Sequence, residues 1–261
     1  MPVTDAPAKA RALYDARRTR VPIPPFTDDD PTLSMADGYA IQRELIELLL
    51  ADGDRIVGHK VGLTSKPMQK MVGVDSPDYG PVLASTIYRD GDTIPAGRFI
   101  APKIEAEIVF VIGERLEGPG VTVTQAHAAI AGAVAAMEIV DSRIADWRIK
   151  LADTVADLAS NGAMATSSRI VPITDIDPRL VGMTLTRNGE LIDTGAGAAA
   201  LGDPVAVVAW LANVLGADGV ALEPGHLIMT GALHAAVPMT PGDVFRAEFD
   251  RLGPITVRVG D

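Results

Sequence analysis

The sequence predicts an α+β fold in which a rolled mixed sheet follows a helical N-terminal extension. From about residue 55 onward, short apolar segments separated by Gly and Pro succeed one another, which is typical of strands joined by turns. Only one strong helical pattern, at 204–215, interrupts this series. Many strands with few helices indicate a β-rich domain whose sheet is rolled or barrel-like.

The first 54 residues show helical rather than strand patterns. Residues 4–18 form a predicted helix rich in Ala and Arg, and a Pro-rich link follows at 21–26. Residues 35–51 form a predicted amphipathic helix, for which Ser34 is a suitable N-cap. We therefore expect a helical N-terminal extension at 1–54 and one β-rich catalytic domain at 55–261.

Strands account for most of the second region. The predicted strands are 55–63, 93–100, 103–112, 133–141, 181–187, 190–194, 226–231, 244–249 and 254–259. Asn188-Gly189 predicts a two-residue hairpin turn between two of them. The helix at 204–215 begins at Pro204, which suits a first turn, and Gly216 suits its end.

Composition excludes several classes of function. The chain of 261 residues is 48% hydrophobic and carries a formal net charge of −11, which argues against nucleic-acid and anionic-membrane partners. It has no cysteine, so thiolate nucleophiles, zinc–thiolate sites and iron–sulfur clusters are excluded. The N-terminus lacks an apolar segment and no stretch is long enough to span a membrane, so we expect a cytoplasmic protein.

Three glutamates are the main candidate functional residues. Because side chains alternate along a strand, Glu105 and Glu107 project from one face of the strand at 103–112. Glu138 lies in a second apolar run, where a buried acid needs a partner. A hard cation such as Mg²⁺ or Mn²⁺ prefers oxygen ligands and would compensate these charges. For the Glu105/Glu107 pair alone, the alternative is a solvated face of an antiparallel sheet.

Other polar residues could act beside such an ion. Lys60 shares a strand face with Gly58 and Gly62, which leave room for a ligand; the alternative is a lysine that extends to solvent. Asp78 is either a turn residue or an acid or base on a loop over the sheet. Ser160 and Asn161, in a predicted loop before Gly162, either present polar groups to a ligand or form a turn.

An ion pair is predicted directly after Glu138. Asp141 and Arg143 either brace the strand that carries the glutamate or form an ordinary surface pair.

Several segments together resemble one enzyme family. They are Gly-His-Lys-Val-Gly-Leu-Thr-Ser-Lys (58–66), Gly-Val-Asp-Ser-Pro-Asp-Tyr-Gly (73–80), Pro-Lys-Ile-Glu-Ala-Glu-Ile (102–108), and further segments at 117–122, 138–150, 194–202 and 208–213. From about residue 35 to the C-terminus, the chain resembles the 2-oxopent-4-enoate (2-hydroxypenta-2,4-dienoate) hydratases of bacterial meta-cleavage pathways, in the fumarylacetoacetate hydrolase superfamily. The resemblance implies a rolled mixed sheet, a homo-oligomer and one Mg²⁺ or Mn²⁺ held by Glu105, Glu107 and Glu138.

The resemblance also implies a reaction. The expected activity is addition of water to 2-hydroxypenta-2,4-dienoate, giving 4-hydroxy-2-oxopentanoate. We expect Lys60 to transfer a proton or orient the substrate carboxylate, and Asp78 to activate water or move a proton, although these two roles could be exchanged. Ser160 and Leu63 are expected to contact the substrate.

Two alternatives stay open at the level of the sequence. One is a 2-oxo-3-hexenedioate (4-oxalocrotonate) decarboxylase of the same fold, which would need a second cationic clamp for its dicarboxylate substrate where the hydratase needs an apolar wall. The other is a catalytically silent metal-binding partner of a neighbouring pathway enzyme.

The chain departs from the pattern of the hydratases at two positions. Leu158 stands where family members commonly have Asn, and Ala232 stands where many have Ser or Thr. If those polar groups contact the substrate, selectivity or rate should differ here.

Overall fold

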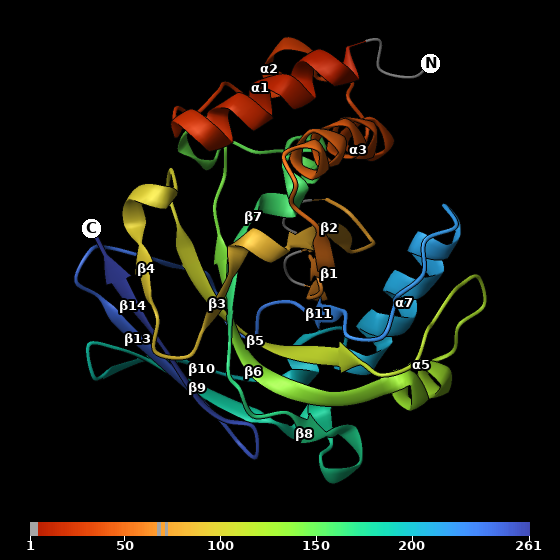
Figure 1. The fold of residues 1–261 in the computed structure, drawn as a ribbon, viewed down its shortest axis with the longest axis vertical. Helices are drawn as coiled ribbons and strands as arrows, with labels where there is room; N and C mark the ends of the chain where they lie inside the picture. Colours follow the sequence, from red (N-terminus) through yellow and green to blue (C-terminus); the bar gives the residue numbers. More distant parts are fainter. Residues whose placement is uncertain (1–4, 67–68, 71–72) are drawn as a thin grey trace.

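Two sheets carry the fold of this protein in a computed structural model that describes residues 5–66, 69–70 and 73–261 (Figure 1). The larger sheet has nine strands, with β2-β1-β11-β5-β6-β7-β3 as its main order, β12 beside β5 and β8 beside β6. Its strands are β1 Ile56–Gly62, β2 Asp78–Leu83, β3 Ile87–Arg89, β5 Lys103–Ile112, β6 Ile130–Val140, β7 Asn161–Thr166, β8 Val171–Pro172, β11 Leu227–Met229 and β12 Val237–Pro238. Parallel and antiparallel pairs both occur, so the predicted mixed sheet is confirmed.

The smaller sheet has five strands in the order β10-β9-β13-β14-β4. These strands are β4 Thr93–Pro95, β9 Gly182–Arg187, β10 Glu190–Ala196, β13 Val244–Phe249 and β14 Gly253–Gly260. Asn188 and Gly189 join β9 to β10 with φ values of 55° and 84°. Two positive φ values are what a type I′ hairpin turn requires, so the predicted hairpin is confirmed.

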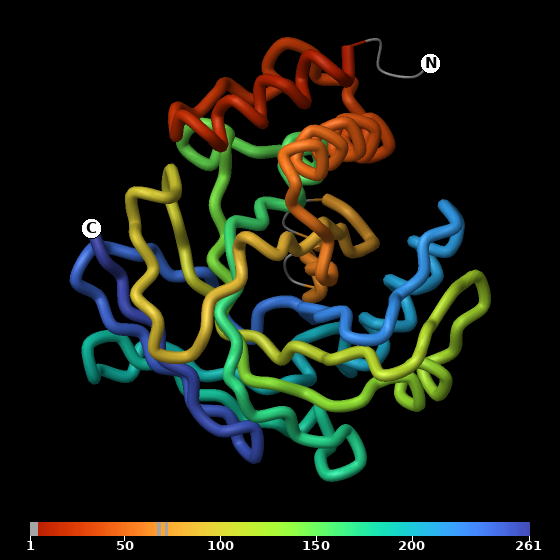
Figure 2. The backbone as a smooth tube through the Cα atoms, viewed as in Figure 1, coloured from red at the N-terminus to blue at the C-terminus, as the bar shows by residue number. Residues whose placement is uncertain are grey.

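Helices cover one end of the larger sheet. They are α1 Ala6–Thr19, α2 Phe26–Asp29, α3 Met35–Ala51 and α6 Leu151–Ala156, while α5 Val123–Ala129 and α7 Pro204–Gly216 lie together elsewhere (Figure 1). Ser34 caps α3 in a capping box with Asp37, as expected for a helix that begins at residue 35. In Figure 2 the red and orange N-terminal helices lie against the green segment that contains α6.

The N-terminal helices pack against the rest of the chain through an apolar interface that also contains buried hydrogen bonds. Leu13, Ile41 and Leu45 pack with Leu158 in one hydrophobic cluster. The Gln42 amide Nε2 donates to the carbonyl oxygens of Tyr79 (3.1 Å) and Val155 (2.7 Å). The division into an extension at 1–54 and a domain at 55–261 stays a prediction.

Alternation along β5 decides where the core and the site lie. Ile104, Ile108 and Phe110 are fully buried in the main hydrophobic core. Glu105 and Glu107 face the other way, as the period of two requires. The core therefore fixes the strand that presents these two carboxylates.

Some expectations from the sequence were wrong. The segment 93–100 is a strand only over Thr93–Pro95 and then turns through a 3₁₀ helix, Ala96–Arg98. Asp78 does not lie on a loop but begins strand β2, and Asn161, expected in a loop, begins strand β7. Strand β2 reads Asp-Tyr-Gly-Pro-Val-Leu and strand β7 reads Asn-Gly-Ala-Met-Ala-Thr, so both are short and lack the apolar alternation from which strands are predicted. In the described part of the chain, no helix is long and apolar enough to cross a membrane.

Candidate active site

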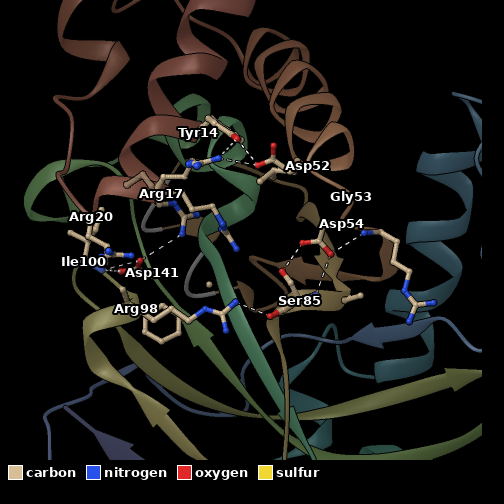
Figure 3. Close-up of a pocket in the computed structure, with 17 residues that line it drawn as sticks. Tyr14, Arg17, Arg20, Asp52, Gly53, Asp54, Ser85, Arg98, Ile100 and Asp141 are labelled. Carbon is tan, nitrogen blue, oxygen red and sulfur yellow. Dashed lines mark hydrogen bonds and ion pairs between the residues drawn. The ribbon is translucent and has the colours of Figure 1, made fainter.

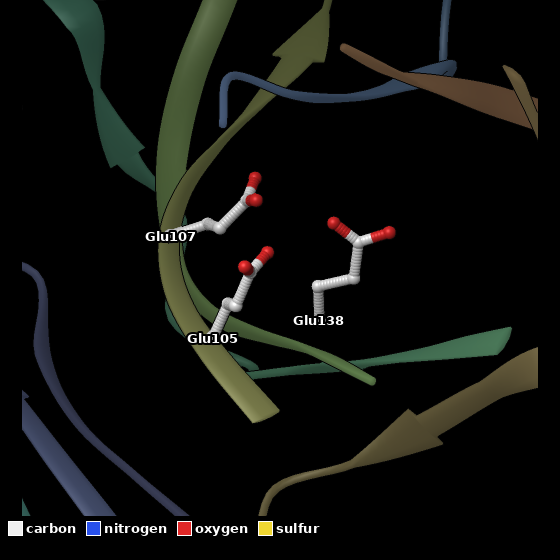
Figure 4. A group of neighbouring side chains, drawn as sticks. All are labelled: Glu105, Glu107 and Glu138. Carbon is white, nitrogen blue, oxygen red and sulfur yellow. The ribbon is translucent and has the colours of Figure 1, made fainter. Parts of the chain in front are cut away.

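Three glutamate side chains meet on one face of the larger sheet. Strands β5 and β6 are antiparallel, and Glu105 lies directly opposite Glu138. Glu107 follows two residues later on the same face of β5. One carboxylate oxygen from each of the three lies within 4.8 Å of the others (Figure 4). Register and alternation therefore build this glutamate cluster without any irregular backbone.

The environment of the cluster fits a divalent cation. Glu107 and Glu138 are fully buried. Glu107 Oε2 accepts from the Gly231 amide at 3.0 Å, and Glu138 Oε1 accepts from Asn161 Nδ2 at 3.0 Å. Glu107 Oε1 and Glu138 Oε2 have no hydrogen-bond partner among the described residues. Buried carboxylate oxygens without partners are costly, and an all-oxygen donor set suits Mg²⁺ or Mn²⁺.

Crowding of the acids changes their protonation. Burial, and then the charge of Glu138, raise the pKa of Glu105 to about 7. Burial and the charges of Glu138 and Glu105 likewise raise the pKa of Glu107 well above its usual value. Each shift measures how much the cluster disfavours further negative charge, which a bound cation would relieve.

Lys60 lies beside the cluster. Its Nζ donates to the Ala159 carbonyl oxygen at 2.8 Å and lies 3.6 Å from Glu138 Oε1. The side chain is only 6% exposed, so the alternative of a lysine that reaches solvent is wrong. Burial lowers the pKa of Lys60, but the charges of Glu138 and Asp78 outweigh this effect and raise it overall. Lys60 is therefore an ammonium at neutral pH and offsets part of the negative charge.

Asp78 reaches the same place from the neighbouring strand. It pairs in register with Gly62 of β1, its carboxylate is buried, and its Oδ1 has no hydrogen-bond partner among the described residues. Burial raises the pKa of Asp78, although Lys60 opposes the shift. A Cβ on Gly62 would lie 2.3 Å from Asp78 Oδ1 and 3.2 Å from Lys60 Nζ. Gly62 therefore makes the space in which these two side chains approach each other.

A left-handed segment links the cluster to Ser160. Leu158, Ala159 and Ser160 have φ values of 55°, 51° and 58°, which is unusual for three successive non-glycine residues. This backbone directs the Ala159 carbonyl to Lys60 and places Asn161 beside Glu138. The Ser160 hydroxyl lies 3.0 Å from Thr154 Oγ1.

A buried ion pair holds this segment in place. Arg143 Nε donates to Asp157 Oδ1 at 2.5 Å, and Arg143 Nη2 donates to the Asp157 carbonyl oxygen at 2.9 Å. Asp141, the predicted partner of Arg143, lies farther away, at 3.7 Å, and accepts instead from the amides of Ile100 and Ala101. The predicted bracing pair is thus mainly Arg143–Asp157, and the surface-pair alternative is wrong because both side chains are buried.

All seven candidate residues line one cavity of about 730 Å³. They are Lys60, Leu63, Asp78, Glu105, Glu107, Glu138 and Ser160. Two residues, Leu158 and Ala232, depart from the sequence pattern of the hydratases. Ala232 lines this cavity, whereas Leu158 is buried in the hydrophobic cluster against the N-terminal helices. A polar residue at 232 could therefore touch a ligand directly, and the Leu158 side chain serves packing.

Some residues of the site are not indicated by any local sequence pattern. Lys103 and His234 also line the cavity, and His234 Nε2 accepts from the Ala106 amide at 2.7 Å, between the two glutamates of β5. The sequence predicts Asn161 only as a loop residue, and no pattern indicates a role for Gly231. The role of Asn161 depends on tertiary pairing with Glu138, which no local pattern predicts.

The fumarylacetoacetate (FAA) hydrolase C-terminal pattern matches residues 53–260. The chain belongs to the fumarylacetoacetate hydrolase family. It is 43% identical over 246 residues to a 2-keto-4-pentenoate hydratase of Paraburkholderia xenovorans (strain LB400), covering 94% of this chain and 91% of the relative. It is 38% identical to a 2-hydroxyhexa-2,4-dienoate hydratase of Comamonas testosteroni, covering 96% of each.

A solved structure shares the whole fold. The 4-oxalocrotonate decarboxylase from Pseudomonas putida G7, complexed with magnesium and adipate, superposes with a TM-score of 0.95 and is 36% identical, covering 98% of this chain and 97% of that one. The predicted fold class and family resemblance are confirmed.

Proposed function

We propose that this protein is a metal-dependent hydratase that adds water to 2-hydroxypenta-2,4-dienoate and forms 4-hydroxy-2-oxopentanoate in a meta-cleavage pathway. The observation that carries this proposal is the buried cluster of Glu105, Glu107 and Glu138 with Lys60 beside it. The cluster occurs in a chain that is 43% identical to a relative named 2-keto-4-pentenoate hydratase. The enzyme class is accordingly a hydro-lyase.

The three glutamates would hold Mg²⁺ or Mn²⁺ through their carboxylate oxygens, of which Glu107 Oε1 and Glu138 Oε2 have no hydrogen-bond partner among the described residues. The related decarboxylase is complexed with magnesium, which supports this assignment. Such a cation, when bound, acts as a Lewis acid that stabilises negative charge on the 2-oxo oxygen of the substrate.

Protonation and deprotonation fall to this chain's own residues. The dienol must lose its enol proton and gain one at C5, which gives the conjugated 2-oxo-3-enoate. Water then adds its oxygen at C4 and a proton at C3. Asp78, whose pKa burial raises, lines the cavity and is the group that we propose to exchange protons with carbon or with water. Lys60, a buried ammonium, orients the substrate carboxylate; the alternative exchanges the two roles.

The rest of the cavity favours an apolar substrate tail. Its apolar lining residues include Leu63, Trp147, Ile149 and Leu151. We propose that Ser160 and Leu63 contact the substrate. An apolar wall suits the short hydrocarbon tail of a pentadienoate better than a second carboxylate.

The decarboxylase is the second candidate. The structure of the related decarboxylase favours it, and so do two further lysines in the cavity, Lys103 and Lys150, which could clamp a distal carboxylate. Lys103 Nζ lies 4.2 Å from the centre of the Trp147 ring, while Lys150 is exposed. The identity to the named hydratase, 43% against 36%, favours hydration.

We further propose a homo-oligomer, a cytoplasmic location and association with a neighbouring pathway enzyme. The homo-oligomer rests on the family resemblance, and the location rests on the absence of an apolar N-terminal segment and of a long apolar stretch in the sequence. Sedimentation equilibrium of the purified protein, alone and mixed with the preceding enzyme of the pathway, would test both kinds of assembly.

The function is tested by an ultraviolet assay of metal-stripped protein with 2-hydroxypenta-2,4-dienoate, with and without Mg²⁺ or Mn²⁺. Metal-dependent loss of dienol absorbance, with 4-hydroxy-2-oxopentanoate identified by mass, is the expected result. If this substrate is not turned over while CO₂ is released from 2-oxo-3-hexenedioate, the protein is a decarboxylase. Tight metal binding without activity on either substrate would favour the silent metal-binding partner.

A further inference from the structure

A second large cavity lies between the N-terminal helices and the sheet, outside the site described above. It measures about 680 Å³, and helix α1, the turn after α3, the segment 98–100 and the segment 141–143 all contribute to its walls (Figure 3). Its volume lies within the range of small-ligand sites in proteins. None of the seven candidate active-site residues lines it.

The charge of this cavity is opposite to that of the protein. Its described lining residues include six arginines and three aspartates, a surplus of positive charge in a chain whose net charge is −11. The arginines are Arg17, Arg18, Arg20, Arg55, Arg98 and Arg143. A concave positive surface on an acidic protein concentrates anions locally.

Few of these arginines have acidic partners. Arg143 pairs with Asp157, and Arg18 Nη1 lies 3.3 Å from Asp52 Oδ2. Arg98 donates to two neutral acceptors, the Ser85 carbonyl oxygen at 2.7 Å and the Tyr88 hydroxyl at 2.8 Å. For Arg17, Arg20, Arg55 and Arg98, no ion pair with a carboxylate occurs among the described residues.

Arg17 is the most buried of these four arginines. Its side chain is half-buried, and its one hydrogen bond within the described part of the chain is a long contact of 3.5 Å from Nη1 to the Asn161 carbonyl oxygen. Burial, and then the charge of Arg143, lower the pKa of Arg17 to about 10. Arg17 nevertheless remains charged at neutral pH, and a half-buried guanidinium without an acidic partner is unfavourable.

We propose that this arginine cavity binds a small dianion that presents phosphate or paired carboxylate oxygens. Guanidinium groups donate in a planar fork that matches both kinds of oxyanion. The ligand would accept hydrogen bonds from Arg17 and, at the exposed rim of the cavity, from Arg20 and Arg98. Asp141 accepts from the backbone amides of Ile100 and Ala101, and among the described residues its ion pair is with Arg143 rather than with Arg17, Arg20 or Arg98.

Isothermal titration calorimetry of the purified full chain tests the proposal, with inorganic phosphate in one arm and succinate in the other. We expect Arg17→Gln to weaken binding by at least about tenfold, since a charge-assisted hydrogen bond is lost. Arg20→Gln changes an exposed side chain and should weaken binding about threefold without affecting folding. Arg246→Gln, which removes the same charge from an exposed Arg–Glu pair on β13, is the matched control and should bind like the wild type.

The two arms identify the class of ligand. Binding of phosphate alone assigns a tetrahedral oxyanion, and binding of succinate with equal affinity assigns dianions in general. Binding of either anion at the glutamate cluster would persist in every variant. Only the part of the binding isotherm that Arg17→Gln loses is therefore assigned to the arginine cavity. The proposal is overturned if neither anion binds, or if Arg17→Gln and Arg20→Gln bind both as tightly as Arg246→Gln.

Discussion

Replacing Lys60 by Met tests whether this lysine acts in the reaction or only in the structure. Methionine keeps the length of the side chain and removes the charge, so Glu138 Oε1 loses an ammonium 3.6 Å away and the Ala159 carbonyl loses its donor at 2.8 Å. At that separation and an effective dielectric constant of about 20, the attraction is about 4–5 kcal/mol. Breaking a buried pair from one side typically costs about 3–5 kcal/mol.

We therefore expect metal-free Lys60→Met to lose about 3–5 kcal/mol in free energy of unfolding, measured by urea denaturation. Saturating Mn²⁺ should restore most of this loss, because the cation supplies the missing positive charge. With Mn²⁺ bound, kcat for dienol consumption should still fall by about 10²–10⁴-fold.

The control for this variant is Lys9→Met, which changes a lysine outside the cavity that pairs with Asp5 on the surface of α1. It should alter stability by less than about 1 kcal/mol and leave kcat unchanged. Full activity of Lys60→Met with Mn²⁺ bound would refute a role for Lys60 in the reaction. Equal loss of activity and metal affinity would assign Lys60 to structure alone.

Three further predictions follow from the site. Gly62→Ala places a Cβ 2.3 Å from Asp78 Oδ1, so kcat should fall at least about tenfold. In the control Gly182→Ala the new Cβ meets nothing within 4 Å, so steady-state kinetics should show an unchanged kcat. Asp157→Ala removes the nearer acidic partner of the buried Arg143 guanidinium and should cost about 3–5 kcal/mol in urea denaturation. Asp177→Ala, in an exposed pair, should cost less than about 1 kcal/mol, and equal losses would contradict the bracing role. Burial and the charge of Glu138 raise the pKa of Glu105 to about 7, so the metal-free fold binds this proton more tightly than the unfolded chain does. The metal-free protein should therefore lose stability as pH rises from about 4.5 through 7, and Mn²⁺ should remove this loss in thermal melts. Melting temperatures that do not depend on pH without metal would oppose this reading.

Local patterns predicted the parts of the site that regular structure builds. The alternation of β5 places Glu105 and Glu107 on one face, and the antiparallel register then sets Glu138 opposite Glu105. Helix α3 and the hairpin at Asn188 were equally predictable, because a capping box and a positive-φ turn are encoded within a few residues.

Other parts depend on contacts between distant residues. Strand β2 has no clear alternation, so its first residue, Asp78, looked like part of a turn until β1 paired with it. The left-handed backbone at 158–160 is held from outside by Arg143, which no local pattern indicates. The arginine cavity likewise exists only because α1 packs against the segments near residues 98 and 141.

Parallel titration of metal binding and activity tests the central claim most directly. Mn²⁺ would be added stepwise to the metal-stripped wild type and to Glu138→Gln, while bound Mn²⁺ is measured by electron paramagnetic resonance and hydration by loss of dienol absorbance. We predict that wild-type activity rises in proportion to bound Mn²⁺ and stops at one ion per chain, and that Glu138→Gln loses tight binding and activity together. Undiminished hydration by the metal-stripped wild type, or by Glu138→Gln without bound Mn²⁺, would contradict the account.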